Sequence, residues 1–209
     1  LVQQQILIMQ KKLPVLVSFD GWGAAGKGSI LGKIIKNIDP RFFKVAVMDK
    51  PTEDEKRRPF LYRYVINIPE AGKFTFMDGG CLDEVTKQKL SGKITDEEYK
   101  RKIESVKRFE RQLSDNGYLV IKFFFHIGEQ EQRKRLTRLL DDKNTRWRVS
   151  EYDWWQNQHY KKSLKAFDQF IDDTSQSIAP WYIIDATDKK WAQLQILETL
   201  VQAIDTALK

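Results

Sequence analysis

Residues 15–29 read VLVSFDGWGAAGKGS, and this stretch decides the fold. Its first five residues are a short apolar run, typical of a strand that is buried on both faces. Gly21, four further residues, Gly26 and Lys27 then follow with the spacing of the Walker A motif, and a helical pattern comes next. A strand, a glycine-rich turn and a helix in this order predict a loop that binds phosphate.

Eight residues of this turn are candidates for binding a phosphate or a nucleotide. Glycines let the backbone bend so that successive N–H groups point inward, and the start of the helix adds positive potential. Lys27 supplies a mobile cation. The residue after the lysine, ordinarily a Ser or Thr that binds Mg²⁺, is Gly28, so either Ser29 takes that part or other groups bind the metal. The candidates are Gly21, Gly23, Ala24, Ala25, Gly26, Lys27, Gly28 and Ser29.

Outward from this loop, apolar runs alternate with helical patterns along the whole chain. This alternation indicates βαβ units, so we expect a single α/β domain over residues 1–209 with a five-stranded parallel sheet. The strands are predicted at Val15–Phe19, Val45–Met48, Phe74–Met77, Leu119–Phe125 and Trp181–Ile184.

Helices are predicted between these strands. Thr52 is a candidate N-cap for a helix over 53–68, which Pro59 should kink or divide. Thr95 and Glu98 form a capping-box pattern for a long helix that ends at Asn116-Gly117. The remaining helices are predicted over 1–9, 29–38, 129–140, 151–171 and 189–208.

Composition and charge narrow the class of partner. Lysine and arginine total 36 against 29 acidic residues, which gives a formal net charge of +7. Such an excess favours a polyanion: nucleic acid, acidic lipid headgroups or phosphate-rich small molecules. No nucleic-acid-binding motif is present, so nucleic acid is disfavoured.

The same composition bears on location. No run of about 18 apolar residues is present, so we expect no association with a membrane. The single cysteine, Cys81, leaves no internal disulfide, which fits a cytoplasmic protein. The sequence starts with Leu1 inside a helical pattern, as a piece of a longer protein would.

Residues 19–28, FDGWGAAGKG, resemble the polyphosphate kinase 2 family, whose members have a segment like Phe-Glu-Gly-x-Asp-Ala-Ala-Gly-Lys-Gly. Further similar segments follow in the family's order along essentially the whole chain. They include Asp39-Pro40-Arg41, Pro51-Thr52-Glu53, Arg63-Tyr64, Pro69-Glu70-Ala71-Gly72, Phe109-Glu110-Arg111, Lys122-Phe123-Phe124-Phe125-His126-Ile127, Thr145-Arg146-Trp147 and Ala179-Pro180-Trp181.

This resemblance implies a three-layer P-loop kinase fold that is thymidylate-kinase-like and has a helical lid. It also implies Mg²⁺-dependent phosphoryl transfer between inorganic polyphosphate and a nucleoside mono- or diphosphate, by a homo-oligomer or beside a tandem partner domain.

The resemblance also assigns roles to single residues. Lys27 would contact the transferred phosphates, Asp78 would be the Walker B carboxylate that binds Mg²⁺, and Arg63 would face phosphate. The basic segment 133–150 would be the lid. Its arginines Arg133, Arg138 and Arg146 would close on the phosphoryl oxygens.

The chain departs from the family pattern in two places. Gly23 stands where the family has Asp, and Asp78-Gly79-Gly80-Cys81-Leu82 stands where the family has Asp-Arg-Ser-Trp-Tyr. An electrostatic group missing from a preorganised site costs about 10²–10³ in rate. Residues that could compensate are the carboxylates Asp20, Asp83 and Glu84 and the cations Arg57 and Arg58.

Three hypotheses therefore stay open. The chain is an active phosphotransferase of the polyphosphate type, or it is a catalytically degenerate domain that binds phosphate or nucleotide beside an active one. The third is a conventional nucleotide or nucleoside kinase that uses ATP.

Overall fold

The computed structural model describes residues 1–48 and 50–209, and its centre is one parallel sheet of five strands in the order β2-β3-β1-β4-β5. Each strand overlaps its predicted range, so the predicted sheet is confirmed. The strands are β1 Val15–Gly21, β2 Phe43–Val47, β3 Phe74–Asp78, β4 Leu119–His126 and β5 Trp181–Asp185.

Strand β1 lies in the middle of the sheet and pairs with β3 on one side and β4 on the other. The chain leaves β1 toward β2 at one edge and later crosses from β3 to β4 on the opposite side. In open parallel sheets, ligands bind outside the carboxyl ends of the strands where the strand order reverses in this way. The glycine-rich loop follows β1 at that position.

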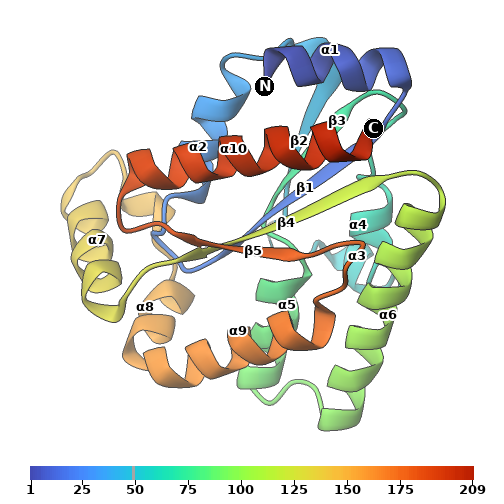
Figure 1. Ribbon diagram of the computed structural model, residues 1–209. Coiled ribbons are helices and arrows are strands. Elements are labelled where there is room, and N and C mark those ends of the chain that lie inside the picture. Colours follow the sequence, from blue (N-terminus) through green and yellow to red (C-terminus); the bar gives the residue numbers. More distant parts are fainter. Residues whose placement is uncertain (49) are drawn as a thin grey trace.

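Helices cover both faces of the sheet, which gives three layers (Figure 1). On one face lie α1 Val2–Lys11, α2 Lys27–Ile35 and α10 Lys189–Ala207. On the other lie α5 Cys81–Leu90, α6 Asp96–Asp115 and α9 Tyr160–Thr174. Beyond the carboxyl ends of the strands, at the left of Figure 1, lie α7 Glu129–Asp141 and α8 Glu151–Gln158.

The core beneath the loop is aromatic. Phe19 of β1 is fully buried, and its ring centroid lies 5.7 Å from those of Phe123 and Phe125 on β4. Ile30 and Ile34 of α2 belong to the same buried cluster. Burial of such a side chain contributes about 1.5–3 kcal/mol, so the strand and helix that flank the loop are both held firmly.

Local signals placed most helix ends correctly. The predicted helix over 53–68 is divided around Pro59 into α3 Glu53–Lys56 and α4 Tyr62–Val65. Capping boxes start α3 at Thr52 and α6 at Thr95, where the Thr side chain and the Glu three residues later bond each other's backbone N–H. Two short 3₁₀ helices are η1 Pro40–Phe42 and η2 Arg146–Arg148.

Helix α5 was not predicted from the sequence, and neither was a break in the helix predicted over 151–171. Helix α5 begins directly after Gly79 and Gly80, and the N–H of Gly80 is held by the buried Asp20 carboxylate, so its start depends on a distant residue. The 151–171 prediction was wrong at His159, where α8 gives way to α9. This turn brings Tyr160 onto Trp22, 138 positions earlier, at a ring distance of 4.1 Å.

In the part of the chain that the structure describes, no helix has the length and apolar character that crossing a bilayer requires.

Candidate phosphate-binding site

A pocket of about 70 Å³ opens at the carboxyl end of β1. The end of β1, the loop that follows it and the first residue of α2 contribute half of the lining, and the other half comes from the β3–α5 region and α8. The lining residues are Asp20, Gly21, Gly23, Lys27, Gly79, Asp83, Asp153 and Gln156. The predicted phosphate loop therefore meets acidic and amide groups from distant parts of the chain.

The backbone of this loop requires glycine at two positions. Gly21 has a φ of 126°, and a Cβ there would lie 2.6 Å from the backbone nitrogen of Phe125. Gly26 has a φ of 99°. Ala24, with a φ of 62°, takes the left-handed conformation although it has a side chain, which costs about 1–2 kcal/mol. Such local strain is typical of functional loops.

Lys27 is the first residue of α2, and its ammonium group lies against the loop. Its Nζ donates hydrogen bonds to the carbonyl oxygens of Gly21 at 2.9 Å and Trp22 at 3.1 Å. An ammonium group has three donors, so these two bonds leave capacity for a phosphate oxygen. The free N–H groups at the start of α2 add further positive potential beside it.

Trp22 fixes the loop to the helix layer below. Its side chain is fully buried, stacks on Tyr160 at an interplanar angle of 7°, and meets the edge of Phe167 at 5.0 Å. The Tyr160 hydroxyl donates to the carbonyl of Ile127 at 2.7 Å. Trp22 stands at a variable position of the motif, and its large aromatic side chain between two glycines, Gly21 and Gly23, is the sequence signal for this anchor.

Arg135 of α7 connects the loop to the β5–α10 turn. Its guanidinium donates to the carbonyls of Ala24 and Ala25 at 3.4 and 3.2 Å. It also donates to the carbonyls of Ala186 and Thr187 at 3.0 and 2.8 Å. In the sequence this arginine is only part of a basic run, because its partners lie far away along the chain.

The arginines predicted for the lid lie elsewhere on the same segment. Arg133 donates through Nε to Asn157 at 3.0 Å. Arg138 and Arg146 are exposed on α7 and η2. None of the three lines the pocket in this arrangement, so a contact between them and phosphate stays a prediction.

Asp78 and Arg63 have different surroundings. Asp78 ends β3, and its Oδ2 lies 3.3 Å from the position that a Cβ on Gly28 would take, so its carboxylate lies beside the first turn of α2. Arg63 has a side chain that is only 9% exposed and lies between Glu55 and Glu84, at 3.9 and 3.8 Å. It is not among the residues that line the pocket.

Two of the three carboxylates expected to compensate do line the pocket. Asp20 accepts hydrogen bonds from Ser18 Oγ at 2.6 Å and Gly80 N–H at 2.8 Å, and burial raises its pKa to about 6. Burial also raises the pKa of Asp83, with Lys27 opposing the rise. The third, Glu84, instead accepts from the Tyr64 hydroxyl at 2.9 Å.

Among the described residues that line the pocket, none is an arginine that could replace the one missing at position 79. Gly79 has a φ of 92°, a conformation that an arginine would adopt only with strain. Arg58, one expected substitute, lies 3.5 Å from Asp54 and over the ring of Tyr62. Arg57, the other, does not line the pocket either.

Gly23 is enclosed by side chains from α7 and α8. Its N–H donates to Gln156 Oε1 at 3.3 Å, and its carbonyl accepts from Gln132 Nε2 at 3.3 Å. A Cβ on Gly23 would lie 2.7 Å from Cγ of Asp153. Local sequence patterns do not predict these partners, because α8 follows the loop by about 130 residues.

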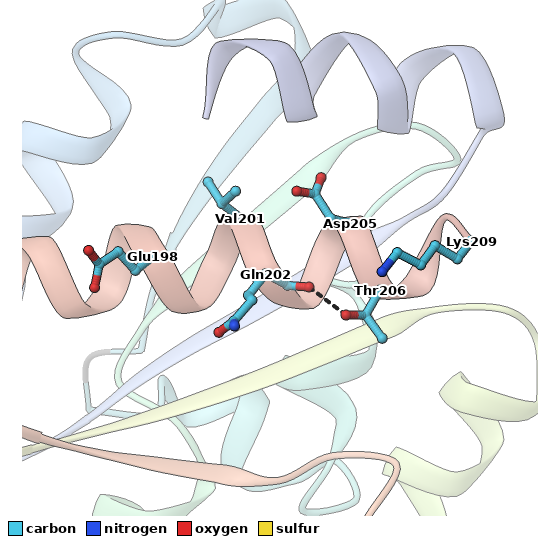
Figure 2. A pocket seen from close by; sticks show the side chains of 6 residues that line it. All are labelled: Glu198, Val201, Gln202, Asp205, Thr206 and Lys209. Atoms are coloured by element: carbon cyan, nitrogen blue, oxygen red, sulfur yellow. Dashed lines mark hydrogen bonds between the residues drawn. The ribbon is translucent and has the colours of Figure 1, made fainter.

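A second, larger hollow of about 480 Å³ lies along α10 (Figure 2). Its lining carries two carboxylates and one lysine, a set that does not favour phosphate. Thr206, one of its residues, donates to its own helix at the carbonyl of Gln202, 2.8 Å away. The lining residues are Glu198, Val201, Gln202, Asp205, Thr206 and Lys209. The pocket at the loop remains the candidate site.

The acidic groups near the loop fit a Mg²⁺ ion that arrives with a phosphate substrate. Among the described residues, no three acidic, histidine or cysteine side chains are placed to hold a metal by themselves. Mg²⁺ usually takes one or two protein carboxylates and completes its shell with water and substrate phosphates. Asp83 and Asp153, which both line the pocket, can supply such a partial set, and Asp78 lies nearby in sequence at the end of β3, beside the first turn of α2.

Comparison with known proteins agrees with this geometry. The family model described as Polyphosphate kinase 2 matches residues 1–209. The chain belongs to the polyphosphate kinase 2 family. A curated relative, the polyphosphate:AMP phosphotransferase of Pseudomonas syringae pv. tomato, is 32% identical over 197 residues. That match covers 94% of this chain and 40% of the relative, so the chain spans about two fifths of the relative's length.

Solved structures confirm the fold. The polyphosphate kinase 2 of Arthrobacter aurescens TC1 superposes with a TM-score of 0.93 at 25% identity, over 98% of this chain and 74% of that one. The thymidylate kinase of Candida albicans gives a TM-score of 0.54 at 11% identity, over 95% of this chain and 94% of that one. The second likeness concerns the fold alone, and it bears out the thymidylate-kinase-like architecture.

Proposed function

We propose that this chain transfers phosphoryl groups between inorganic polyphosphate and a nucleoside mono- or diphosphate, with Mg²⁺. The observation that carries this function is the pocket in which Lys27, the loop backbone and carboxylates from three other elements meet. Family membership supports it, as does the name of the Pseudomonas syringae relative, which specifies polyphosphate and AMP.

In this mechanism the loop N–H groups and Lys27 bind and orient the phosphates. Phosphoryl transfer depends mainly on positioning and on neutralising spread negative charge. Lys27 is already held at the loop by two carbonyls, so it needs little reorganisation to meet a phosphoryl oxygen. Asp78 and Asp83 would hold Mg²⁺, which supplies further neutralisation of phosphate charge when bound.

The segment 133–150 would act as the lid. Arg138 and Arg146 are exposed, and movement of this segment would bring them with Arg133 onto the phosphates and exclude water. The net charge of +7 fits a polyanionic substrate. The proposal includes a cytoplasmic location, with which the free thiol of Cys81 agrees.

A homo-oligomer or a tandem partner domain also belongs to the proposal. The partner domain is supported by the share of the relative that this chain spans, about two fifths. Light scattering on the full-length protein would give its mass in solution.

A binding domain without turnover is the second candidate, and one observation favours it. The β3–α5 turn carries Gly79 in the left-handed region, and the pocket lining that the structure describes contains no arginine. Such a domain would bind phosphates beside an active partner.

The test is transfer from polyphosphate to AMP, ADP, GMP and GDP, with the products separated by chromatography. Lys27→Ala should lower kcat/KM by about 10²–10³. Lys36→Ala, an exposed lysine just past α2, is the matched control and should leave the rate unchanged.

Three outcomes decide between the candidates. If the wild type binds phosphate but turns over no faster than Lys27→Ala, the chain is a binding domain without turnover. Faster turnover with ATP than with polyphosphate as sole donor would establish a conventional nucleotide kinase. If the wild type neither binds phosphate nor turns over, both the phosphotransferase and the binding domain are contradicted.

A further inference from the structure

The space above Gly23 is filled by a carboxylate from another element. Unlike Gly21 and Gly26, Gly23 has a backbone outside the left-handed region, so the conformation itself would accept a side chain. The obstacle to a side chain is Asp153, whose Cγ would lie 2.7 Å from a Cβ on Gly23, so any side chain there requires Asp153 to shift. Real Cβ atoms essentially never approach a neighbour that closely.

The orientation of Asp153 is fixed by the start of α8. Its Oδ2 accepts hydrogen bonds from the N–H of Ser150 at 2.7 Å and from the Ser150 hydroxyl at 2.8 Å. The Asp153 N–H donates back to Ser150 Oγ, which completes a capping box. The other carboxylate oxygen, Oδ1, points toward the position that a Cβ on Gly23 would take. The cap therefore leaves one oxygen for the pocket.

Helix α8 itself is held onto the loop by three buried amides. Gln156 and Gln132 bond the N–H and the carbonyl of Gly23. Asn157 donates to Gln132 Oε1 at 3.1 Å and to the carbonyl of Glu129 at 2.9 Å. Buried networks of satisfied polar groups specify a single arrangement. The network thus fixes where Asp153 meets the phosphate loop.

We propose that Asp153 is a carboxylate of the transfer site, delivered to the phosphate loop by α8, and that Gly23 lacks a side chain because Asp153 takes its place. Asp153 has this role only if the chain transfers phosphoryl groups, so the inference rests on the proposed function.

The charge of Asp153 should have opposite effects on phosphate binding in the absence and in the presence of Mg²⁺. A carboxylate beside bound phosphate repels it in the absence of a cation, and attracts the Mg²⁺ that accompanies it. Asp153 should therefore weaken metal-free binding of phosphate and strengthen binding in the presence of Mg²⁺. If Asp153 only held α8 in place, its substitution would change phosphate binding equally with and without Mg²⁺.

The experiment measures tripolyphosphate binding by calorimetry, in EDTA and in saturating Mg²⁺. Asp153→Asn keeps the size of the side chain and an oxygen for the Ser150 cap, so the fold should survive. We expect the factor by which Mg²⁺ strengthens binding to fall about tenfold or more, as for a coupling between two ligands. Glu151→Gln, an exposed change on the same helix, is the matched control and should leave that factor unchanged.

A carboxylate exchange gives a second readout. Gly23→Asp alone would displace Asp153 and should lower the midpoint of thermal unfolding. Asp153→Ala makes room for the new carboxylate, so the double variant should regain the Mg²⁺ dependence of tripolyphosphate binding and should unfold at a higher temperature than Gly23→Asp alone.

The outcomes separate this inference from the proposed function. If Asp153→Asn keeps the wild-type Mg²⁺ factor while the wild type binds and transfers phosphate, Asp153 is not part of the site and the proposed function stands. If wild type fails to bind tripolyphosphate in either condition, both are overturned.

Discussion

Asp20 should make the stability of this protein depend on pH in a direction opposite to that of an ordinary ion-paired aspartate. Burial raises its pKa from 3.8 to about 6, against the hydrogen bonds from Ser18 and Gly80. A difference of one in pKa corresponds to about 1.4 kcal/mol, so the ionised form costs the folded state about 3 kcal/mol. The side chain is 1% exposed, so solvent screens little of this cost.

The sign follows from proton linkage. The folded state binds the Asp20 proton more tightly than the unfolded chain does, so this group lowers the free energy of unfolding as pH rises from about 4 to about 6. Asp20→Asn stays neutral throughout and can still accept from Gly80, while its amide donates to Ser18. The free energy of unfolding of the variant minus that of wild type should therefore rise by about 3 kcal/mol across this interval and then level off.

Urea unfolding in EDTA, followed by tryptophan fluorescence at several pH values between about 4 and 8, measures this difference. Asp39→Asn is the contrasting control, because Arg41 lowers the pKa of Asp39 to about 2. The contribution of Asp39 is lost only as pH falls below its unfolded pKa of 3.8, so that difference should be flat above about pH 5. A flat or falling difference for Asp20→Asn between about pH 4 and 6 would refute the reasoning.

Two further substitutions test contacts that hold the site and the sheet. Arg135→Lys keeps the charge but cannot reach both pairs of carbonyls; we expect a loss of about 2–3 kcal/mol in urea unfolding and slower phosphoryl transfer, whereas exposed Lys134→Ala should change neither. Lys122→Met leaves the buried Glu110 without its ammonium partner and should cost about 3–5 kcal/mol. Glu110 lies on α6, and Lys107→Met breaks an exposed pair with Glu104 on that helix. This change should lower the free energy of unfolding by less than about 0.5 kcal/mol. Equal effects of the two lysine changes would contradict the buried-pair account.

The glycines at positions 23 and 79 illustrate what could and could not be predicted from the sequence. From the sequence alone both are losses, one of a carboxylate and one of an arginine. In the fold, Asp153 occupies the space at Gly23, and Gly79 takes a conformation that suits glycine. Whether a missing side chain matters depends on its neighbours in space, which a single sequence does not display.

The sequence by itself determined the strand, loop and helix around Lys27, the five strands of the sheet and the capped ends of α3 and α6. These features follow from periodicity, turn residues and caps, which act over a few neighbouring positions. Only the tertiary structure decided that Asp153 and Gln156 meet Gly23 and that the helix predicted over 151–171 is interrupted at His159. Gly23 and Gln156 are 133 positions apart, and packing of whole helices against the sheet, not local preference, brings them into contact.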